Sequence, residues 1–168
     1  GEQYMNVLEF GLAFAHLNRR EIIRQLTAIL AEYFNQQVDY DIWSSTHHNH
    51  AIRQGELIIH RKGATPAPKG CKAVIPGNMK EGCFLVEGKG NSQFLHSSSH
   101  GAGRIMGRKE AKQTITLEQF TKELEGITTT IIPELLDEAP QAYKNIHHVL
   151  EQQKEAITII GQVKPIIN

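Results

Sequence analysis

A histidine in a run of small residues is the part of this sequence best suited to chemistry on a phosphate. Residues 97–108 read Ser-Ser-Ser-His-Gly-Ala-Gly-Arg-Ile-Met-Gly-Arg. The two glycines beside the histidine allow positive φ and a close approach, so that backbone N–H groups can face an anion. His100 would then be a nucleophile or a metal ligand. A helix that begins after Gly103 would place Arg104 and Arg108 on one face for bidentate phosphate contacts. These residues alone also allow a Gly/Ser turn with a surface histidine.

A second cluster of candidate residues is the string Thr46-His47-His48-Asn49-His50. Neutral imidazole is a common ligand of borderline divalent ions such as Mn²⁺ or Zn²⁺. Adjacent side chains on an extended chain point to opposite faces, so at most one or two of the three histidines could bind one ion. The alternative is a polar surface loop. The string His60-Arg61-Lys62 has two readings as well, a basic rim for RNA phosphates or a solvated charged turn.

The periodicity of apolar residues predicts helices towards the two ends of the sequence and strands in its central part. We expect helices at 4–34, as one helix or two, at 117–124 after a Thr116 N-cap, and at 142–161. We expect short strands at 38–42, 56–60, 73–75 and 83–87, with the histidine cluster on the connection between the first two. Pro133 should open a further helical turn. The expected fold class is α+β, a mixed α/β core whose strand-rich centre is flanked by helices.

Composition limits the possible functions. The 168 residues carry 18 basic and 18 acidic side chains, so a generally cationic surface is excluded and any affinity for RNA must come from local clusters. Two cysteines without a CxxC pair argue against a disulfide scaffold or a zinc finger and favour a cytoplasmic location. No apolar run approaches the ~20 residues that a membrane-spanning helix needs. The length suits one domain or part of a larger one.

Several ordered motifs across nearly the whole chain resemble the RtcB RNA-splicing ligase family. They include the string Ser-Ser-Ser-His-Gly-Ala-Gly-Arg at 97–104 and, in order along the chain, Asn18-Arg19, His48-Asn49-x-Ala51, His60-Arg61-Lys62-Gly63-Ala64, Ile75-Pro76-Gly77-x-Met79, Gly88-Lys89-Gly90-Asn91 and Asp137-Glu138-Ala139-Pro140-Gln141-Ala142-Tyr143-Lys144. The resemblance implies the RtcB type of fold. It also implies a GTP- and Mn²⁺-dependent enzyme that joins RNA 2′,3′-cyclic-phosphate or 3′-phosphate ends to 5′-hydroxyl ends, in tRNA splicing or RNA repair.

The resemblance also assigns roles to individual residues. His100 would attack the α-phosphate of GTP, form a covalent histidine–GMP phosphoramidate, and pass the guanylate to an RNA 3′-phosphate. His48 would be a ligand of a two-metal Mn²⁺ site. Nucleotide contacts are implied for Asn49, Asn78, Cys83, Ala102, Gly103 and Tyr143. Contacts with RNA-end phosphates are implied for Arg104 and Arg108. A tyrosine such as Tyr143 could instead serve packing, with its hydroxyl satisfied within the protein.

The sequence departs from the family pattern in two ways. Asn78 and Cys83 stand where many members have serine; Asn78 can still form hydrogen bonds, whereas Cys83 is a poorer partner. Other family metal ligands precede the region represented here, and the terminal lysine that contacts guanine is expected beyond Asn168. We therefore expect residues 1–168 to be the C-terminal portion of a single catalytic domain, with the N-terminal metal-ligand portion of the same protein as a partner.

Two other functions also fit the sequence. The first is a non-catalytic relative that binds RNA ends or nucleotides, in which the changes at Asn78 and Cys83 reflect lost guanylylation; the retained His100 and arginines oppose it. The second is a metal-dependent phosphoesterase that uses its histidines for hydrolysis alone. A covalent guanylate on the protein would separate the ligase from both.

Overall fold

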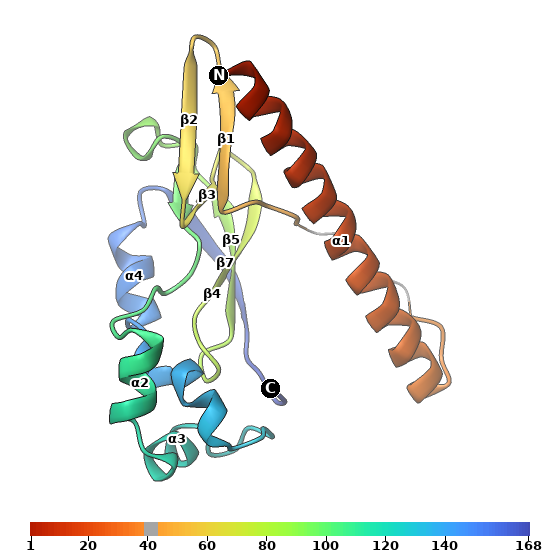
Figure 1. Cartoon of the computed structure of the whole chain (residues 1–168), viewed down its shortest axis with the longest axis vertical. Helices are drawn as coiled ribbons and strands as arrows, with labels where there is room; N and C mark the ends of the chain where they lie inside the picture. Colours follow the sequence, from red (N-terminus) through yellow and green to blue (C-terminus); the bar gives the residue numbers. More distant parts are fainter. Residues whose placement is uncertain (39–43) are drawn as a thin grey trace. The chain divides into compact units, whose positions relative to one another are not determined.

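The computed structural model describes residues 1–38 and 44–168. These residues belong to two compact units, Gly1–Lys62 and Gly63–Asn168. The strand expected at 38–42 lies outside the described residues, apart from Val38, which is not in a strand. Helices and small antiparallel sheets make up both units, so the predicted α+β class is confirmed (Figure 1).

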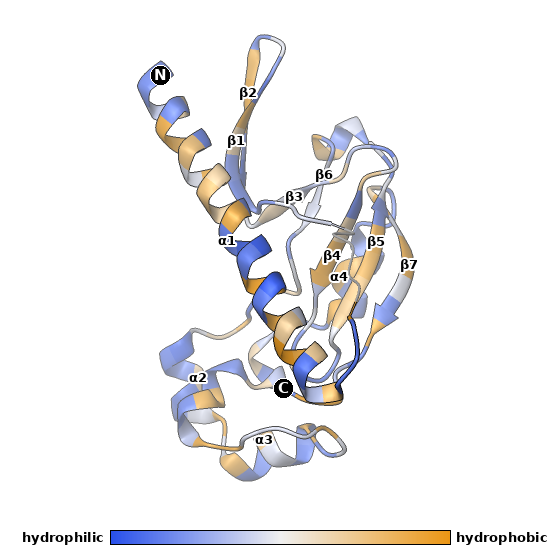
Figure 2. Ribbon diagram, turned by 90° about the vertical axis from the view of Figure 1, so that its right-hand side faces the viewer, coloured by the Kyte–Doolittle hydropathy of each residue, from blue (hydrophilic) through white to orange (hydrophobic). Residues whose placement is uncertain are grey.

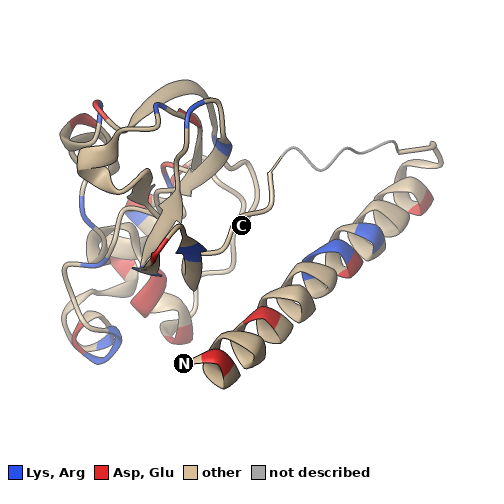
Figure 3. Cartoon of the chain, turned by 90° about the horizontal axis from the view of Figure 1, so that it is seen from above, with Lys and Arg blue, Asp and Glu red and all other residues tan. Residues whose placement is uncertain are grey.

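The first unit begins with a single long helix, which confirms the helix predicted at 4–34. Helix α1 spans Glu2–Phe34 and ends at Asn35, whose φ of 49° is left-handed and whose N–H caps the last turn. Apolar and polar bands alternate along α1 (Figure 2), and its charged side chains gather mainly in its middle part (Figure 3). Met5 is its buried residue, and large apolar side chains elsewhere on the helix are exposed.

A two-stranded hairpin completes the first unit. Strand β1 (Asn49–Gln54) pairs antiparallel with β2 (Leu57–Lys62) through a two-residue turn that begins at Gly55, where φ is 61°. This tight turn fixes the register and extends β1 back to Asn49. The prediction that the whole histidine cluster lies on a connection is therefore wrong for its last two residues, because Asn49 and His50 belong to β1.

The second unit contains two antiparallel sheets. Strand β3 (Ala64–Pro66) pairs with β6 (Ser97–Ser99), and β5 (Cys83–Gly88) lies between β4 (Lys72–Pro76) and β7 (Ile157–Val163). The strands predicted at 73–75 and 83–87 are confirmed as β4 and β5. Along β5, every second residue is buried, as expected for a sheet with one face on the core.

Short helices surround these sheets. They are α2 (Arg108–Thr114), α3 (Leu117–Glu123), α4 (Ile146–Gln152) and the 3₁₀ turns η1 (Ser92–Phe94), η2 (Pro133–Glu138) and η3 (Pro140–Ala142). The predicted N-cap is confirmed, because the Thr116 hydroxyl accepts a hydrogen bond from the Gln119 N–H while the Gln119 side chain caps the Thr116 N–H. Pro133 opens η2, as expected.

The helix predicted at 142–161 is wrong over more than half of its length. Asn145 caps the start of α4 by accepting hydrogen bonds from two backbone N–H groups, and α4 ends at Gln152. The chain then forms β7, which pairs with β5. The run Ile-Thr-Ile-Ile at 157–160 is β-branched throughout and prefers a strand, and pairing with β5 decides the conformation.

Two hydrophobic cores stabilise the second unit. One lies between the three-stranded sheet and α4, with Ile75, Val86 and Ile146 almost fully buried. The other lies among α2, α3 and the turns at 133–142, around the fully buried Phe120. Tyr143 packs against both cores. In the parts of the chain that the structure describes, no helix has both the length and the apolar character needed to cross a membrane.

Gly82 gives a stability test of the junction between the β4–β5 turn and the chain after β7. At Gly82 φ is +72°, and a Cβ there would collide with the carbonyl oxygen of Val163 and lie 2.9 Å from Cδ of Pro165. We expect Gly82→Ala to lower the free energy of unfolding by about 2–3 kcal/mol. Gly126→Ala is the control, because φ is +86° there but nothing lies within 4 Å of the added Cβ. Equal losses in urea unfolding would contradict the predicted contact.

Candidate functional site

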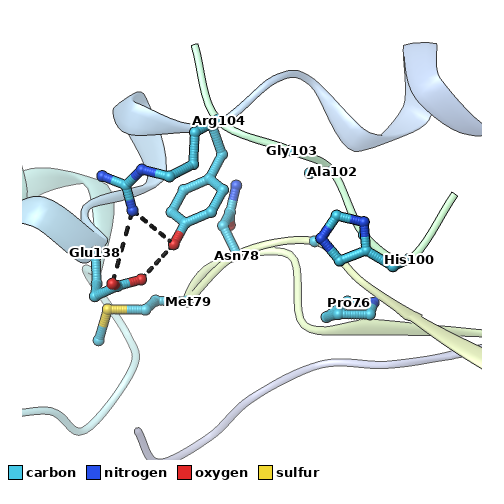
Figure 4. Close-up of a pocket in the computed structure, with 11 residues that line it drawn as sticks. Pro76, Asn78, Met79, His100, Ala102, Gly103, Arg104 and Glu138 are labelled. Atoms are coloured by element: carbon cyan, nitrogen blue, oxygen red, sulfur yellow. Dashed lines mark hydrogen bonds and ion pairs between the residues drawn. The ribbon is translucent and has the colours of Figure 1, made fainter. Parts of the chain in front are cut away.

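A cavity of about 460 Å³ in the second unit collects much of the predicted site. Its walls come from residues 76–79 after β4, from residues 100–104 after β6, and from Glu138 and Tyr143. Figure 4 shows His100 at one end, Glu138 at the other and Asn78 between them. Segments far apart in the sequence therefore meet here, and the volume lies in the range typical of small-molecule sites.

The imidazole of His100 is oriented by a backbone carbonyl. Its Nδ1 lies 2.6 Å from the oxygen of Gly63, which also accepts the His100 backbone N–H at 3.3 Å. A carbonyl oxygen can only accept, so Nδ1 must carry the proton. In the neutral ring the lone pair is then on Nε2. This is the tautomer that a histidine needs to act as a nucleophile through Nε2.

Two neighbours keep this arrangement in place. Gly63 has a φ of +68°, and a Cβ there would lie 3.3 Å from both Cε1 and Nδ1 of His100, so glycine allows both the turn and the close approach. The buried Gln153 accepts the Ser99 N–H at 2.8 Å and donates to the Ser99 hydroxyl at 2.7 Å. The residue before His100 is thus anchored to the end of α4.

Arg104 forms a fixed part of the cavity wall. Its Nε donates to the Met106 carbonyl at 3.1 Å, its Nη2 donates to the Asp137 carbonyl, and its Nη1 donates to the Tyr143 hydroxyl at 3.1 Å. The helix that could have begun directly after Gly103 does not form there. Arg104 instead forms a β-bridge with Tyr143, and α2 begins only at Arg108. Arg104 and Arg108 therefore do not share a helix face, and three hydrogen bonds fix the Arg104 guanidinium instead.

The far end of the cavity has a carboxylate. The Tyr143 hydroxyl donates to Glu138, and Nη1 of Arg104 lies 3.7 Å from Oε1 of the same carboxylate. The guanidinium carbon of Arg104 also lies 4.9 Å from the centre of the Tyr143 ring. Burial is the main cause of a raised pKa of Tyr143, and the hydrogen bond with Glu138 adds to it. The hydroxyl therefore stays protonated at neutral pH. A positive wall and a negative group therefore meet at this end.

Asn78 lines the cavity, and its hydrogen bonds fix the orientation of its side-chain amide. Its Oδ1 accepts the backbone N–H groups of Lys80 and Glu81, both at 2.9 Å. A backbone N–H can only donate, so the oxygen of the amide must be the atom that faces the turn. The amide nitrogen is then the group of Asn78 that can serve a ligand. Asn78 thus offers donors, which suit a phosphate or another acceptor.

The glycine loop after His100 differs in detail from the prediction. Gly103 has a φ of +73°, whereas Gly101 has no positive φ. Gly101 is buried against Pro76, and a Cβ there would lie 3.0 Å from the Pro76 carbonyl oxygen. The loop therefore packs closely on the end of β4, and the Ala102 N–H also donates to Pro76 at 2.9 Å.

The family model described as tRNA-splicing ligase RtcB matches residues 1–168. The chain belongs to the RtcB family. The family assignment that the motifs predicted is therefore confirmed.

Curated RtcB relatives are considerably longer than this chain. The RNA-splicing ligase RtcB of Escherichia coli K12 is 29% identical over 175 residues, which cover 99% of this chain and 43% of the relative. The tRNA-splicing ligase RtcB of Pyrococcus horikoshii is 27% identical over 199 residues, with 99% and 23% covered. The chain thus spans less than half the length of these relatives.

Four further residues predicted from the RtcB resemblance lie in the first unit, Gly1–Lys62. His48 and Asn49 are exposed, and Lys62 is exposed at the end of β2. Arg61 is 5% exposed, and its Nη1 lies 3.4 Å from Nε2 of His50. Burial lowers the pKa of Arg61. The alternative of a solvated charged turn therefore does not fit Arg61, which is buried in β2, and the RNA contacts of Arg61 and Lys62 stay predictions.

The histidines beside His48 are partly shielded from water. Burial is the main cause of a lowered pKa at both His47 and His50, and Arg19 and Arg61 respectively add to it. Their ring centres are 6.1 Å apart. Within residues 1–38 and 44–168, no group of three histidine, cysteine or acidic side chains is placed to hold a metal ion. His48 as a metal ligand stays a prediction.

Cys83 does not line the cavity that contains His100. It lies at the start of β5, beside a separate cavity of about 320 Å³ that Asn78 and Asn168 also line. Burial raises the pKa of Cys83, so it remains a neutral thiol at neutral pH. Its predicted contact with a nucleotide has no support from this placement.

Sequence reasoning assigned no role to two residues that shape the cavity. Gly63 supplies the carbonyl that orients His100, and Glu138 supplies the carboxylate. Both belong to strings that resembled the RtcB family, but nothing in their spacing showed which cavity they reach. Three-dimensional pairing of β3 with β6 brings Gly63 to His100.

Proposed function

We propose that this chain is the nucleotidyl-transfer part of an RNA ligase that joins 3′-phosphate or 2′,3′-cyclic-phosphate ends to 5′-hydroxyl ends, with GTP as its energy source. The observation that supports this most is the orientation of His100. Its Nδ1 is held by Gly63 at 2.6 Å, while the ring lines a cavity that also contains an arginine and small residues. Membership of the RtcB family supports the same reaction class.

In the proposed first step, Nε2 of His100 attacks the α-phosphorus of GTP. An N–P bond forms as the P–O bond to pyrophosphate breaks, and pyrophosphate leaves. An oxygen of the RNA 3′-phosphate then attacks the same phosphorus, the N–P bond breaks, and the histidine is restored. The 5′-hydroxyl finally attacks the activated RNA phosphate, loses its proton, and displaces GMP. Each step exchanges one bond to phosphorus for another, so positioning and charge neutralisation matter most.

The residues around the cavity would perform the positioning. Arg104 places positive charge on the wall, and the amide nitrogen of Asn78 offers donors to phosphate oxygens. Ala102 and Gly103 also line the cavity, although the Ala102 N–H already donates to the Pro76 carbonyl oxygen. Tyr143 has its hydroxyl satisfied by Glu138, so its ring is the part suited to contact a nucleobase.

We propose that the Mn²⁺ site is completed by ligands beyond those that the structure describes. In the described part of the chain, potential ligands do not gather in threes. We propose His48 as one ligand, with the remaining ligands supplied from outside residues 1–168. When bound, the metal would polarise phosphate groups.

The experiment that tests the proposal is mass spectrometry of the full-length protein after incubation with GTP and Mn²⁺. We expect a GMP adduct on the peptide that contains His100, and transfer of that GMP to an RNA that ends in a 3′-phosphate. A metal-loaded, folded protein that forms no adduct but releases phosphate would support a phosphoesterase. Binding of nucleotide or RNA without either reaction would support a non-catalytic relative.

A further inference from the structure

Two neighbouring carboxylates hold the positive face of α2. Nη1 of Arg108 donates to Oδ2 of Asp137 at 2.6 Å and also to Glu138. One turn further along α2, Nζ of Lys112 lies 3.3 Å from Oδ1 of Asp137. Both oxygens of Asp137 are thus used, each by a cation from the same helix face.

Burial differs sharply between the carboxylates and the arginine. The Asp137 side chain is 10% exposed and that of Glu138 is 33% exposed, whereas that of Arg108 is 66% exposed. Asp137 lies at the end of η2, against α2. Hydrogen bonding from Arg108, helped by Lys112, lowers the pKa of Asp137, so it is ionised at neutral pH. A buried anion therefore anchors an exposed cation.

The two carboxylates engage only one nitrogen of Arg108. Within the described residues, its hydrogen bonds are made through Nη1, and its Nε and Nη2 donate to no protein group. The edge formed by Nε and Nη2 is a bidentate edge of a guanidinium, the geometry that matches two phosphate oxygens. Glu138 also lines the cavity, so Arg108 is bonded directly to a residue of the cavity wall.

We propose that Asp137 and Glu138 are positioning residues that hold Arg108 by Nη1 and thereby present its Nε/Nη2 edge to the terminal phosphate of an RNA substrate. This inference rests on the proposed function, because it assigns that phosphate to the rim of the same cavity. It gives roles to two carboxylates that touch neither the nucleophile nor the transferred group.

The carboxylates could instead compete with the RNA phosphate, by taking up the hydrogen-bond donors of Arg108 and by repelling the negative charge of the phosphate. The geometry favours positioning, because carboxylates and phosphate would use different nitrogens of one guanidinium. Arg108, Lys112 and Arg104 also outnumber the two carboxylates around them, so the cluster keeps a net positive charge. A free arginine side chain would have to lose rotamer freedom on binding, whereas an anchored one has already lost it.

A double-mutant cycle separates these effects. The measurement is the Kd of the full-length protein for a fluorescent RNA oligonucleotide with a 3′-phosphate, by anisotropy, with the 3′-hydroxyl oligonucleotide as reference. We expect Asp137→Asn to weaken 3′-phosphate binding about tenfold and to shrink the preference over 3′-hydroxyl RNA. Adding Asp137→Asn to Arg108→Ala should have no further effect. Losses that multiply, or tighter binding by Asp137→Asn, would overturn the proposal.

Further variants guard against a change in folding. Glu151→Gln breaks the exposed ion pair with Lys154 and serves as the matched control, with expected binding equal to wild type. If Asp137→Asn lowers the unfolding midpoint, the cycle is repeated with Glu138→Gln, whose amide oxygen can still accept from Tyr143. A wild type that binds both RNAs equally would overturn the proposed function itself. A wild type that prefers the 3′-phosphate, with multiplying losses in the variants, would overturn the carboxylates' role alone.

Discussion

Replacing His100 with asparagine should abolish the covalent GMP adduct in the full-length protein. The asparagine side chain is smaller, but its amide nitrogen can take the position of Nδ1 and still donate to the Gly63 carbonyl, so the loop should keep its conformation. It lacks a nucleophilic ring nitrogen, so no N–P bond can form. We expect the rate of adduct formation, followed by intact mass with GTP and Mn²⁺, to fall by at least about 10³-fold.

His96 offers a matched control for this variant. It lies four residues earlier in the same segment and has a φ of 50°, a conformation that asparagine tolerates better than most residues. It does not line the cavity. His96→Asn should therefore form the adduct at the wild-type rate. An adduct that persists in His100→Asn would assign the nucleophile to another residue and would refute the proposed first step.

Much of the fold follows from local patterns. Helix α1 carries apolar residues at helical spacing over its whole length and has no internal proline, so its extent could be predicted. Helix α3 has a complete capping box around Thr116, and β5 alternates buried and less buried positions. In these elements the local preference and the tertiary structure agree.

The prediction was wrong where pairing partners decide the structure. The apolar residues at 157–160 fit one face of a helix as well as a strand, and the partner strand β5 lies about 70 residues earlier in the chain. The spacing of Arg104 and Arg108 likewise fitted a helix. Arg104 is instead bonded to backbone carbonyls at Met106 and Asp137, and sequence spacing carries no information about such contacts.

The candidate site was predicted in its residue types but not in its geometry. Small residues and a histidine at 97–104 indicated phosphate chemistry, and residues 100–104 of this string do line a cavity. The tautomer of His100 depends on a carbonyl 37 residues away, and the polarity of Asn78 depends on the turn that follows it. Both properties arise from hydrogen bonds that form only in the folded chain.

Changing Asn78 to aspartate should weaken nucleotide binding about 10²- to 10³-fold. Oδ1 of Asn78 caps the turn by accepting from Lys80 and Glu81, and an aspartate oxygen can do the same with a stronger, charge-assisted bond. The amide nitrogen that faces the cavity would become a carboxylate oxygen. A negative group would then oppose the phosphates of GTP in a partly enclosed site, where like charges cost several kcal/mol.

Asn78→Ser is the control that separates charge from capping. Serine also accepts hydrogen bonds from a following turn and can donate to a phosphate, so we expect its Kd for GTP to stay within about threefold of wild type. The Kd of each variant is measured by calorimetry, with urea unfolding as the test of the turn. If Asn78→Asp bound GTP as tightly as wild type while remaining folded, the phosphates could not lie beside residue 78. The cavity would then hold its nucleotide in another orientation, with the phosphates confined to the loop at 100–104.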